Sequence, residues 1–274
     1  MDDSILPMHC HALARRLVAE ARAIREELGR LEDTRPLPEV TGAEPRDVYF
    51  EGCAAWRKAQ RLATEVGADA SPVVPAAPLL QNLKPVHVYR LLEGVLAQVE
   101  SVKARLGITE KRTTAAPETG RQPSDVLVAL VNVNRELSRA LERPFTPSDV
   151  YATVALASSY AQRLGASGAA ASFERRRQPA HCYAQLDKCL AKLGALIVKR
   201  GEKSLAHRGT PPDVLPGDVY DLAQLVLGEL AFLHALTPSA APMHAFEPTV
   251  TGHRLPSHVD QLARTLEAQL ASIA

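Results

Sequence analysis

The sequence is poor in aromatic residues and carries no excess of one charge. Phe, Trp and Tyr make up 4% of the 274 residues, whereas Ala, Leu and Val are abundant, a bias that favours helices over strands. Lys and Arg number 32 and Asp and Glu 31, so no strong basic field exists to attract nucleic acid or an anionic membrane. The composition therefore predicts an all-α protein that does not bind nucleic acid.

Long apolar runs and paired cysteines are also missing. No stretch of about 18 apolar residues occurs, and the first residues, MDDSILPMHC, lack the charged and then apolar layout of a secretion signal. We therefore expect a cytoplasmic protein without a membrane span, with the periplasm as the alternative if a signal peptide was removed. The four cysteines form no Cys-x-x-Cys pair and are expected to be reduced thiols.

One short pattern recurs along the chain. The second residue after a recurring proline is Asp or His, the third is Val or Cys, and the fourth is Tyr in five copies. The eight copies are PMHCH from Pro7, PRDVY from Pro45, PVHVY from Pro85, PSDVL from Pro123, PSDVY from Pro147, PAHCY from Pro179, PGDVY from Pro216 and PSHVD from Pro256. Proline is favoured at the first position of a helix, so each copy predicts a helix start.

The rest of each copy supports a helix of about five turns. Residues 3, 7, 10, 14 and 17 after the prolines are apolar across the copies, which is the alternating step of a heptad seam. Gly29, Gly67, Gly107 and Gly201 follow their prolines at one common spacing, as expected for residues that end a helix. The sequence predicts eight antiparallel helices built from an internal repeat.

A narrow seam on each helix favours two tandem up-down four-helix bundles. Only the short stretch RPFT separates the fourth and fifth predicted helices, so we place the boundary there, with bundles at residues 1–143 and 146–274. One continuous eight-helix array is the alternative. The other connections are longer than usual in bundles and contain apolar residues, so we expect them to pack along the helices.

The Asp/His position is the third residue of each predicted helix, where a side chain can accept a hydrogen bond from a free first-turn amide. Only Thr146, among the residues before the prolines, is a good N-cap. The simplest role for this position is therefore helix capping. The residues concerned are His9, Asp47, His87, Asp125, Asp149, His181, Asp218 and His258.

A metal site is a second hypothesis for the same position, because neutral imidazole also binds metal ions. In up-down bundles, helices that start with His and helices that start with Asp would begin at opposite ends. The short linker would then bring the histidine end of the first bundle towards the aspartate end of the second. The predicted metal ligands are His9, His87, Asp149 and Asp218, with Cys10 and His11 as further candidates.

Two other kinds of chemistry have weaker support in the sequence. The repeat tyrosines are expected to cover the helix starts, and a ligand pocket lined by them is the alternative; they are Tyr49, Tyr89, Tyr151, Tyr183 and Tyr220. Cys10 and Cys182 each follow a histidine, but adjacent helical residues point in different directions, so a thiolate nucleophile is not favoured.

Taken together, the patterns favour a non-enzymatic, tandem helical-bundle protein without a cofactor. It would bind a protein partner or itself as an interaction or scaffolding module. The alternative is a sensor of a small ligand or divalent metal that uses the Asp, His and Tyr residues at the helix starts. Hydrolytic activity at those ends ranks third.

Overall fold

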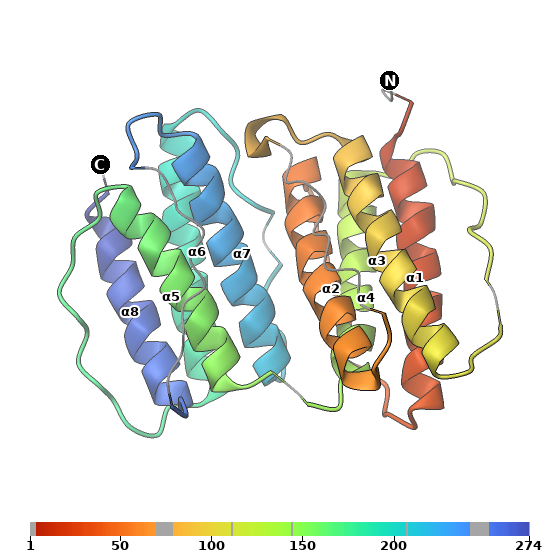
Figure 1. Cartoon of the computed structure of the whole chain (residues 1–274). Helices are drawn as coiled ribbons and strands as arrows, with labels where there is room; N and C mark the ends of the chain where they lie inside the picture. The colour runs from red at the N-terminus through yellow and green to blue at the C-terminus, as the bar shows by residue number, and fades with distance from the viewer. Residues whose placement is uncertain are drawn as a thin grey trace. The chain divides into compact units, whose positions relative to one another are not determined.

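The computed structural model of the chain describes residues 4–69, 79–110, 112–143, 145–206, 208–241 and 252–273. Within these ranges it contains eight α-helices, one short 3-10 helix and no strand (Figure 1). The elements are α1 Pro7–Glu27, α2 Pro45–Val66, η1 Leu80–Asn82, α3 Pro85–Arg105, α4 Pro123–Ala140, α5 Pro147–Arg163, α6 Pro179–Lys199, α7 Pro216–Ala235 and α8 Pro256–Ala271. The all-α prediction is confirmed, and each α-helix begins at a proline of the repeat. None of the helices in the described part of the chain has the length and apolarity to cross a membrane.

The helix ends follow from local chemistry. Gly67 ends α2 with φ of 67°, a left-handed conformation that costs glycine little because it has no Cβ. The amide of Ala68 then donates to the carbonyl of Ala63 at 2.8 Å, which pairs a carbonyl that the helix leaves open. The sequence places proline and glycine where the backbone needs them.

The chain forms two compact units. Unit 1 comprises the described residues of Met1–Pro144 together with Leu205–Gly209, and unit 2 those of Phe145–Ser204 and Thr210–Ala274. The first crossing between units lies between residues 144 and 145. Segment 205–209 follows α6 in the chain but belongs to unit 1.

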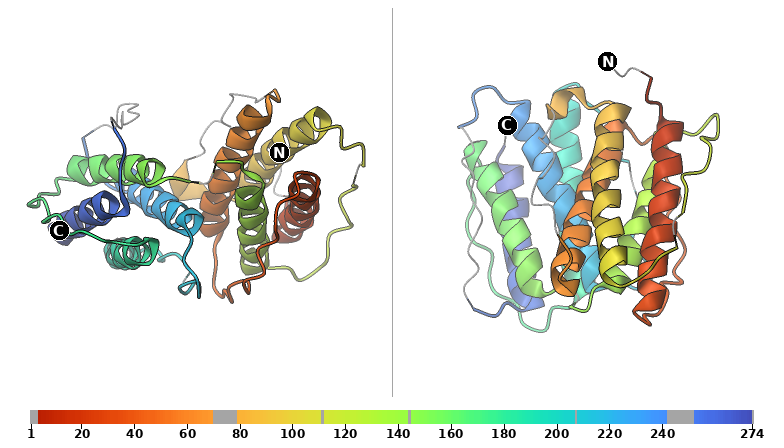
Figure 2. Two further views of the ribbon diagram at one scale, coloured as in Figure 1. Left: turned by 90° about the horizontal axis from the view of Figure 1, so that it is seen from below. Right: turned by 45° about the vertical axis from the view of Figure 1, so that its right-hand side comes forward.

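Within each unit, four helices pack in a closed ring. In unit 1, α1 and α2 each pack against both α3 and α4, and in unit 2, α5 and α6 each pack against both α7 and α8 (Figure 2). The first and second helices of a unit therefore occupy opposite corners. The same order of packing in both units places matching helices at matching corners.

The helices of each unit are parallel, so the prediction of antiparallel, up-down helices was wrong. In unit 1, residues from the first turns of all four helices line one small cavity. All four helices therefore begin at the same end of the unit (Figure 1). In unit 2 the thiol of Cys182 donates to the carbonyl of Pro256 at 3.2 Å, linking the starts of α6 and α8. The amide of Arg254, just before α8, donates to Ser148 Oγ at 3.1 Å, and the Phe145 ring stacks on Tyr220 at 3.9 Å, which joins the starts of α5, α7 and α8.

The long connections make the parallel arrangement feasible. A helix of about 21 residues is about 32 Å long, whereas roughly 15 extended residues span about 50 Å. A connection of that length can return along the whole helix before the next helix starts. We call the described parts of three such connections, residues 28–44, 106–122 and 164–178, the return segments.

Hydrogen bonds fix the direction of the return segment 164–178. The amide of Ser167 donates to Ser272 Oγ at 2.9 Å near the end of α8, and the amide of Ala171 donates to Thr265 Oγ1 at 3.0 Å. The amide of Arg177 donates to Ser257 Oγ at 3.2 Å, in the first turn of α8. The segment therefore runs along α8 from its end to its start.

The other two return segments behave in the same way. Along α4, Asp33 pairs with Arg139 at 3.8 Å and the amide of Ala43 donates to Ser124 Oγ at 3.1 Å, so residues 28–44 run from the end of α4 to its start. Along α1, the amide of Arg112 donates to Glu20 Oε1 at 3.3 Å and Arg15 donates to Glu118 Oε1 at 2.6 Å. The structural unit of the fold is thus a helix followed by an extended return.

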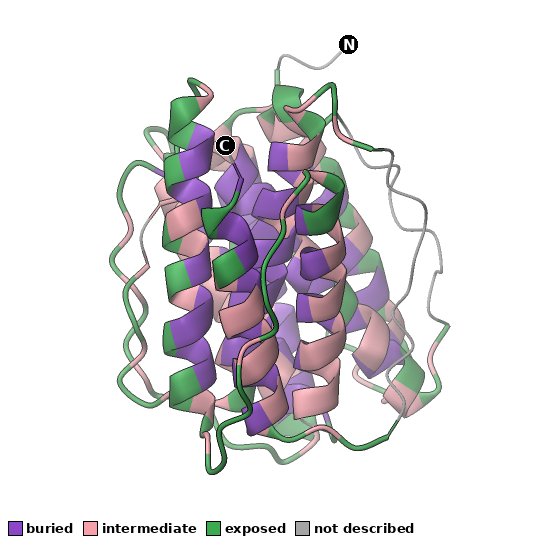
Figure 3. Cartoon of the chain, turned by 90° about the vertical axis from the view of Figure 1, so that its left-hand side faces the viewer, coloured by how far each residue is buried: buried purple, intermediate pink, exposed green. Residues whose placement is uncertain are grey.

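The predicted seam forms the core of each unit. In α3 the side chains of Val88, Leu92, Val95, Val99 and Val102 are all buried, and the corresponding residues of α6 and α8 are buried as well. Figure 3 shows buried residues on the inner side of the helices and exposed residues on the outer side. Apolar burial of this kind is the main favourable contribution to the folding free energy.

Candidate functional site

The four aspartates of the repeat all accept a hydrogen bond from the backbone amide of the residue before the helix. The amide of Glu44 donates to Asp47 at 2.9 Å. The amides of Gln122, Thr146 and Leu215 donate to Asp125, Asp149 and Asp218, respectively, each at 2.7 Å. Thr146 alone returns the bond, because its Oγ1 accepts from the amide of Asp149 at 3.3 Å. Each aspartate thus satisfies an amide at the positive end of its own helix.

The four histidines do the same with one ring nitrogen. Nδ1 accepts from the backbone amide three residues earlier at 3.0 Å in every case, from Leu6 to His9, Lys84 to His87, Gln178 to His181 and Leu255 to His258. A nitrogen that accepts this bond carries no proton, so the geometry selects the neutral ring with its proton on Nε2. Histidine is therefore a neutral equivalent of aspartate at this position.

The parallel helices change where these residues lie. His9, Asp47, His87 and Asp125 all sit at one end of unit 1, so the prediction that His and Asp copies lie at opposite ends was wrong. Around the ring, the His-starting helices α1 and α3 are neighbours, as are the Asp-starting α2 and α4. Unit 2 repeats this pattern, with α6 beside α8 and α5 beside α7.

The predicted metal ligands are divided between the two units. His9 and His87 belong to unit 1 and Asp149 and Asp218 to unit 2, and each caps its own helix. Among the residues that the structure describes, no three His, Cys, Asp or Glu side chains are placed to hold a metal ion. Burial, followed by the positive charge of Arg121, lowers the pKa of His11. The hypothesis of metal binding depended on the antiparallel arrangement, which the fold does not have.

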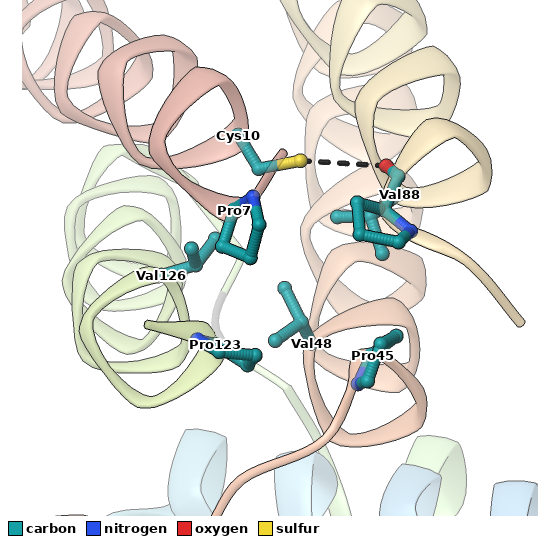
Figure 4. Close-up of a pocket in the computed structure, with 8 residues that line it drawn as sticks. Pro7, Cys10, Pro45, Val48, Val88, Pro123 and Val126 are labelled. Carbon is teal, nitrogen blue, oxygen red and sulfur yellow. Dashed lines mark hydrogen bonds between the residues drawn. The ribbon is translucent and has the colours of Figure 1, made fainter. Parts of the chain in front are cut away.

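A small cavity lies on the axis of unit 1, where the four helices begin (Figure 4). Its free space is about 10 Å³, room for one water molecule, whereas a pocket for a small ligand is roughly 300–1,000 Å³. Its lining is apolar and comprises Pro7, Cys10, Pro45, Val48, Pro85, Val88, Pro123 and Val126. This cavity is a packing feature of the parallel helix starts.

The cysteines at these ends serve as neutral donors. Burial raises the pKa of Cys10 and of Cys182 to about 12, so both are protonated at neutral pH. The Cys10 thiol donates to the Pro85 carbonyl at 3.4 Å, the bond drawn in Figure 4, and Cys182 makes the equivalent bond to Pro256 in unit 2. A nucleophile requires the thiolate, so neither residue is suited to covalent catalysis.

The five repeat tyrosines do not surround a common space. Tyr49, Tyr183 and Tyr220 are buried, and Tyr89 and Tyr151 are partly exposed. In unit 2 the guanidinium of Arg254 lies 4.6 Å from the centre of the Tyr151 ring, while Tyr220 stacks on Phe145. Burial raises the pKa of Tyr49 above its ordinary value. Tyr151 and Tyr220 thus each contact a residue that precedes a helix start, Arg254 and Phe145.

The structure also brings together buried polar residues that the sequence did not predict, and one such cluster involves segment 205–209. In unit 1, Asp47 and Glu51 lie one turn apart on α2, are 1% and 2% exposed, and face segment 205–209. Asn134 Nδ2 donates to Glu51 Oε1 at 2.7 Å, and Lys58 Nζ donates to the Asn134 carbonyl at 3.2 Å. We call Asp47 and Glu51 the acidic slot and Leu205–Gly209 the latch segment.

A signal for this cluster was present in the sequence. Glu51 and Lys58 are seven residues apart and flank the seam of α2, where their charged side chains are adjacent to core positions. That pattern indicates a buried polar column, but the residue that pairs with Glu51 lies 157 positions away and no local pattern identifies it.

Comparison with known proteins gives no relative. No protein-family model, no curated protein and no solved structure matches the chain. The candidate sites therefore depend on their geometry alone.

Proposed function

We propose that the protein is a non-enzymatic interaction module made of two tandem four-helix bundles that derive from one internal repeat. The observation that carries this proposal is that the return segments expose large apolar side chains. Leu31 and Leu37 on segment 28–44 are 84% and 40% exposed, and Phe173 on segment 164–178 is 43% exposed. Such side chains are suited to contact with a partner protein or a second copy.

The fixed backbone of these segments supports binding. Arg135 donates to the carbonyls of Arg35 and Pro36 at 2.8 and 3.0 Å, so the stretch that carries Leu31 and Leu37 is held against α4. A partner would then bind an ordered surface and lose less conformational entropy than with a free loop. Burial of one leucine contributes about 1.5–3 kcal/mol.

The capping residues and thiols give further support to a non-enzymatic role. The side chains that could best take part in catalysis, such as Cys10, Asp125 and His258, already form hydrogen bonds with backbone groups at 2.7–3.4 Å. These side chains stabilise the helix starts. Leu31, Leu37 and Phe173 on the return segments are among the large apolar side chains that remain exposed.

The test is capture of a partner from a lysate of the source organism by immobilised protein, together with light scattering of the purified chain. We expect a partner or self-association that the double variant Leu31→Ser/Leu37→Ser weakens at least about tenfold, as loss of about 1.4 kcal/mol predicts. Val198→Ser is the matched control, because Val198 is 56% exposed on α6 and lies outside the return segments.

Two results would count against the proposal. One is a chain that neither associates nor captures a partner while it turns over a substrate. The other is equal loss of binding in the double variant and in Val198→Ser.

A further inference from the structure

The latch segment belongs to unit 1, although the residues on both sides of it in the chain belong to unit 2. Leu205–Gly209 lies between α6 and α7 in the chain, and the chain therefore crosses between units at 144/145, 204/205 and 209/210. The contacts of the latch segment must therefore compensate for ordering it.

Asp47 offers the latch segment a second acceptor. Its Oδ2 accepts the capping bond from Glu44, and its Oδ1 accepts from the backbone amide of Ala206 at 2.7 Å. A capping histidine has only an N–H donor left on its ring, so it could not accept this second bond. At this copy of the repeat, the aspartate therefore accepts a hydrogen bond from the latch segment as well as the capping bond of α2.

Glu51 gives the contact its preference for arginine. Its Oε1 accepts from Asn134 at 2.7 Å, and its Oε2 pairs with Nη1 of Arg208. The Glu51 side chain is 3% exposed and that of Arg208 is 15% exposed. A buried carboxylate needs a cation with directed hydrogen bonds, and the planar guanidinium supplies both.

From these contacts we propose that the acidic slot is a docking site for a peptide segment with a free backbone amide two residues before an arginine. The latch segment of the same chain is its resident occupant and closes it to the same segment from a second copy. This inference rests on the proposed interaction function and names the chemistry of the partner. The exposed leucines of the return segment have no part in it.

The resident segment holds the slot closed because it is tethered. Residues 200–204 and 210–215 connect it to α6 and α7, so its effective concentration at the slot is on the order of millimolar. A peptide in solution competes only when the binding of the resident segment to the acidic slot is weakened. Opening of the latch therefore controls access to the slot.

The experiment measures binding of a labelled synthetic peptide with the sequence of residues 203–211, KSLAHRGTP, to the full-length chain by fluorescence anisotropy. We expect Arg208→Ala to bind the peptide at least tenfold more tightly than the wild type, because the resident arginine no longer occupies the slot. Adding Glu51→Gln to Arg208→Ala should abolish binding, and a peptide with Ala in place of its Arg should not bind. Arg176→Ala removes an exposed arginine outside the latch segment, and this control should bind the peptide no better than the wild type.

A second variant tests the same inference in case Arg208→Ala does not fold. Ala206→Pro removes the amide that donates to Asp47 and leaves Arg208 in place, and it should also open the slot. The inference is overturned if neither folded variant binds the peptide, or if Glu51→Gln leaves binding unchanged. Loss of partner capture in Leu31→Ser/Leu37→Ser concerns the return segment instead, so each proposal can fail without the other.

Discussion

At the scale of single residues, aspartate and histidine both cap the helices, but they differ in the polar group that remains for a second hydrogen bond. Asp47 and Asp125 each use a second oxygen, to accept from the Ala206 amide at 2.7 Å and from Arg121 at 3.3 Å. A neutral histidine leaves an N–H instead. The capping role follows from the sequence, because it depends on residues three apart. The second partner of Asp47 does not, because the Ala206 amide lies 159 positions away, whereas Arg121 lies only four residues before Asp125.

The cap at His87 predicts a dependence of stability on pH. Burial, followed by the positive charges of Arg90 and Lys84, lowers the pKa of His87 from its ordinary value of 6.5. Because the folded-state pKa lies below the unfolded value, this residue contributes stability above pH 6.5 that is lost as the pH falls through the folded-state pKa. His87→Ala should cost about 1 kcal/mol at pH 7.5, the usual value of a cap.

Urea unfolding at pH 7.5 and pH 5.5 checks this prediction. The difference between wild type and His87→Ala should shrink at the lower pH, because the unfolded ring then carries a proton that must be lost for Nδ1 to accept the amide. His87→Asp is the control, since its carboxylate stays charged at both values and should keep the cap. An unchanged difference between wild type and His87→Ala at the two pH values would contradict the proposed role of the neutral ring.

At the scale of helices and connections, the parallel arrangement explains why half of the caps are neutral. Each helix start carries about half a positive charge, so four at one end of a unit sum to about two. Two aspartates supply two negative charges, and two neutral histidines complete the capping without adding more. Each unit has two of each residue at its helix starts.

The sequence predicts the helices and their buried side well but not their direction. Proline, glycine and the seam act within one helix, so α3 and its buried valines follow from residues 85–105 alone. A heptad seam packs against parallel and antiparallel neighbours alike. Direction depends on whether a connection such as 164–178 crosses between adjacent ends or returns along a helix, and its hydrogen bonds to α8 involve residues about 90–105 positions away.

A single arginine, Arg135, holds the return segment 28–44 against α4. Arg135→Ala removes two hydrogen bonds to the carbonyls of Arg35 and Pro36 and should destabilise the protein by about 1–2 kcal/mol. It should also release segment 28–44, so that trypsin cleaves after the exposed Arg30 several times faster. Timed digestion with mass spectrometry measures that cleavage. Lys188→Ala, which removes an exposed cation from α6, is the control, and equal cleavage in both variants would argue against a fixed return segment.

At the scale of the whole molecule, the latch segment makes the stability of unit 1 depend on residues far along the chain. Trp56 is the only tryptophan and is buried in α2, so its fluorescence reports on unit 1 alone. Neither the boundary at residues 143–146 nor the repeat pattern identifies this dependence. It arises from a pairing between Arg208 and Glu51, which only the folded chain brings together.

Removal of the Arg208 side chain should therefore destabilise unit 1. Arg208→Ala takes the guanidinium away from the Glu51 carboxylate, which costs up to about 3–5 kcal/mol, the value for a charge that stays buried without its partner. In denaturant titrations the Trp56 transition should move to lower denaturant, while far-ultraviolet circular dichroism should retain a later transition from unit 2. The double variant Arg208→Ala/Glu51→Gln should recover part of the loss, because a neutral amide needs no cation. If the Trp56 transition does not move, or if the double variant is no more stable than Arg208→Ala, the Arg208–Glu51 pair does not hold the latch segment on unit 1.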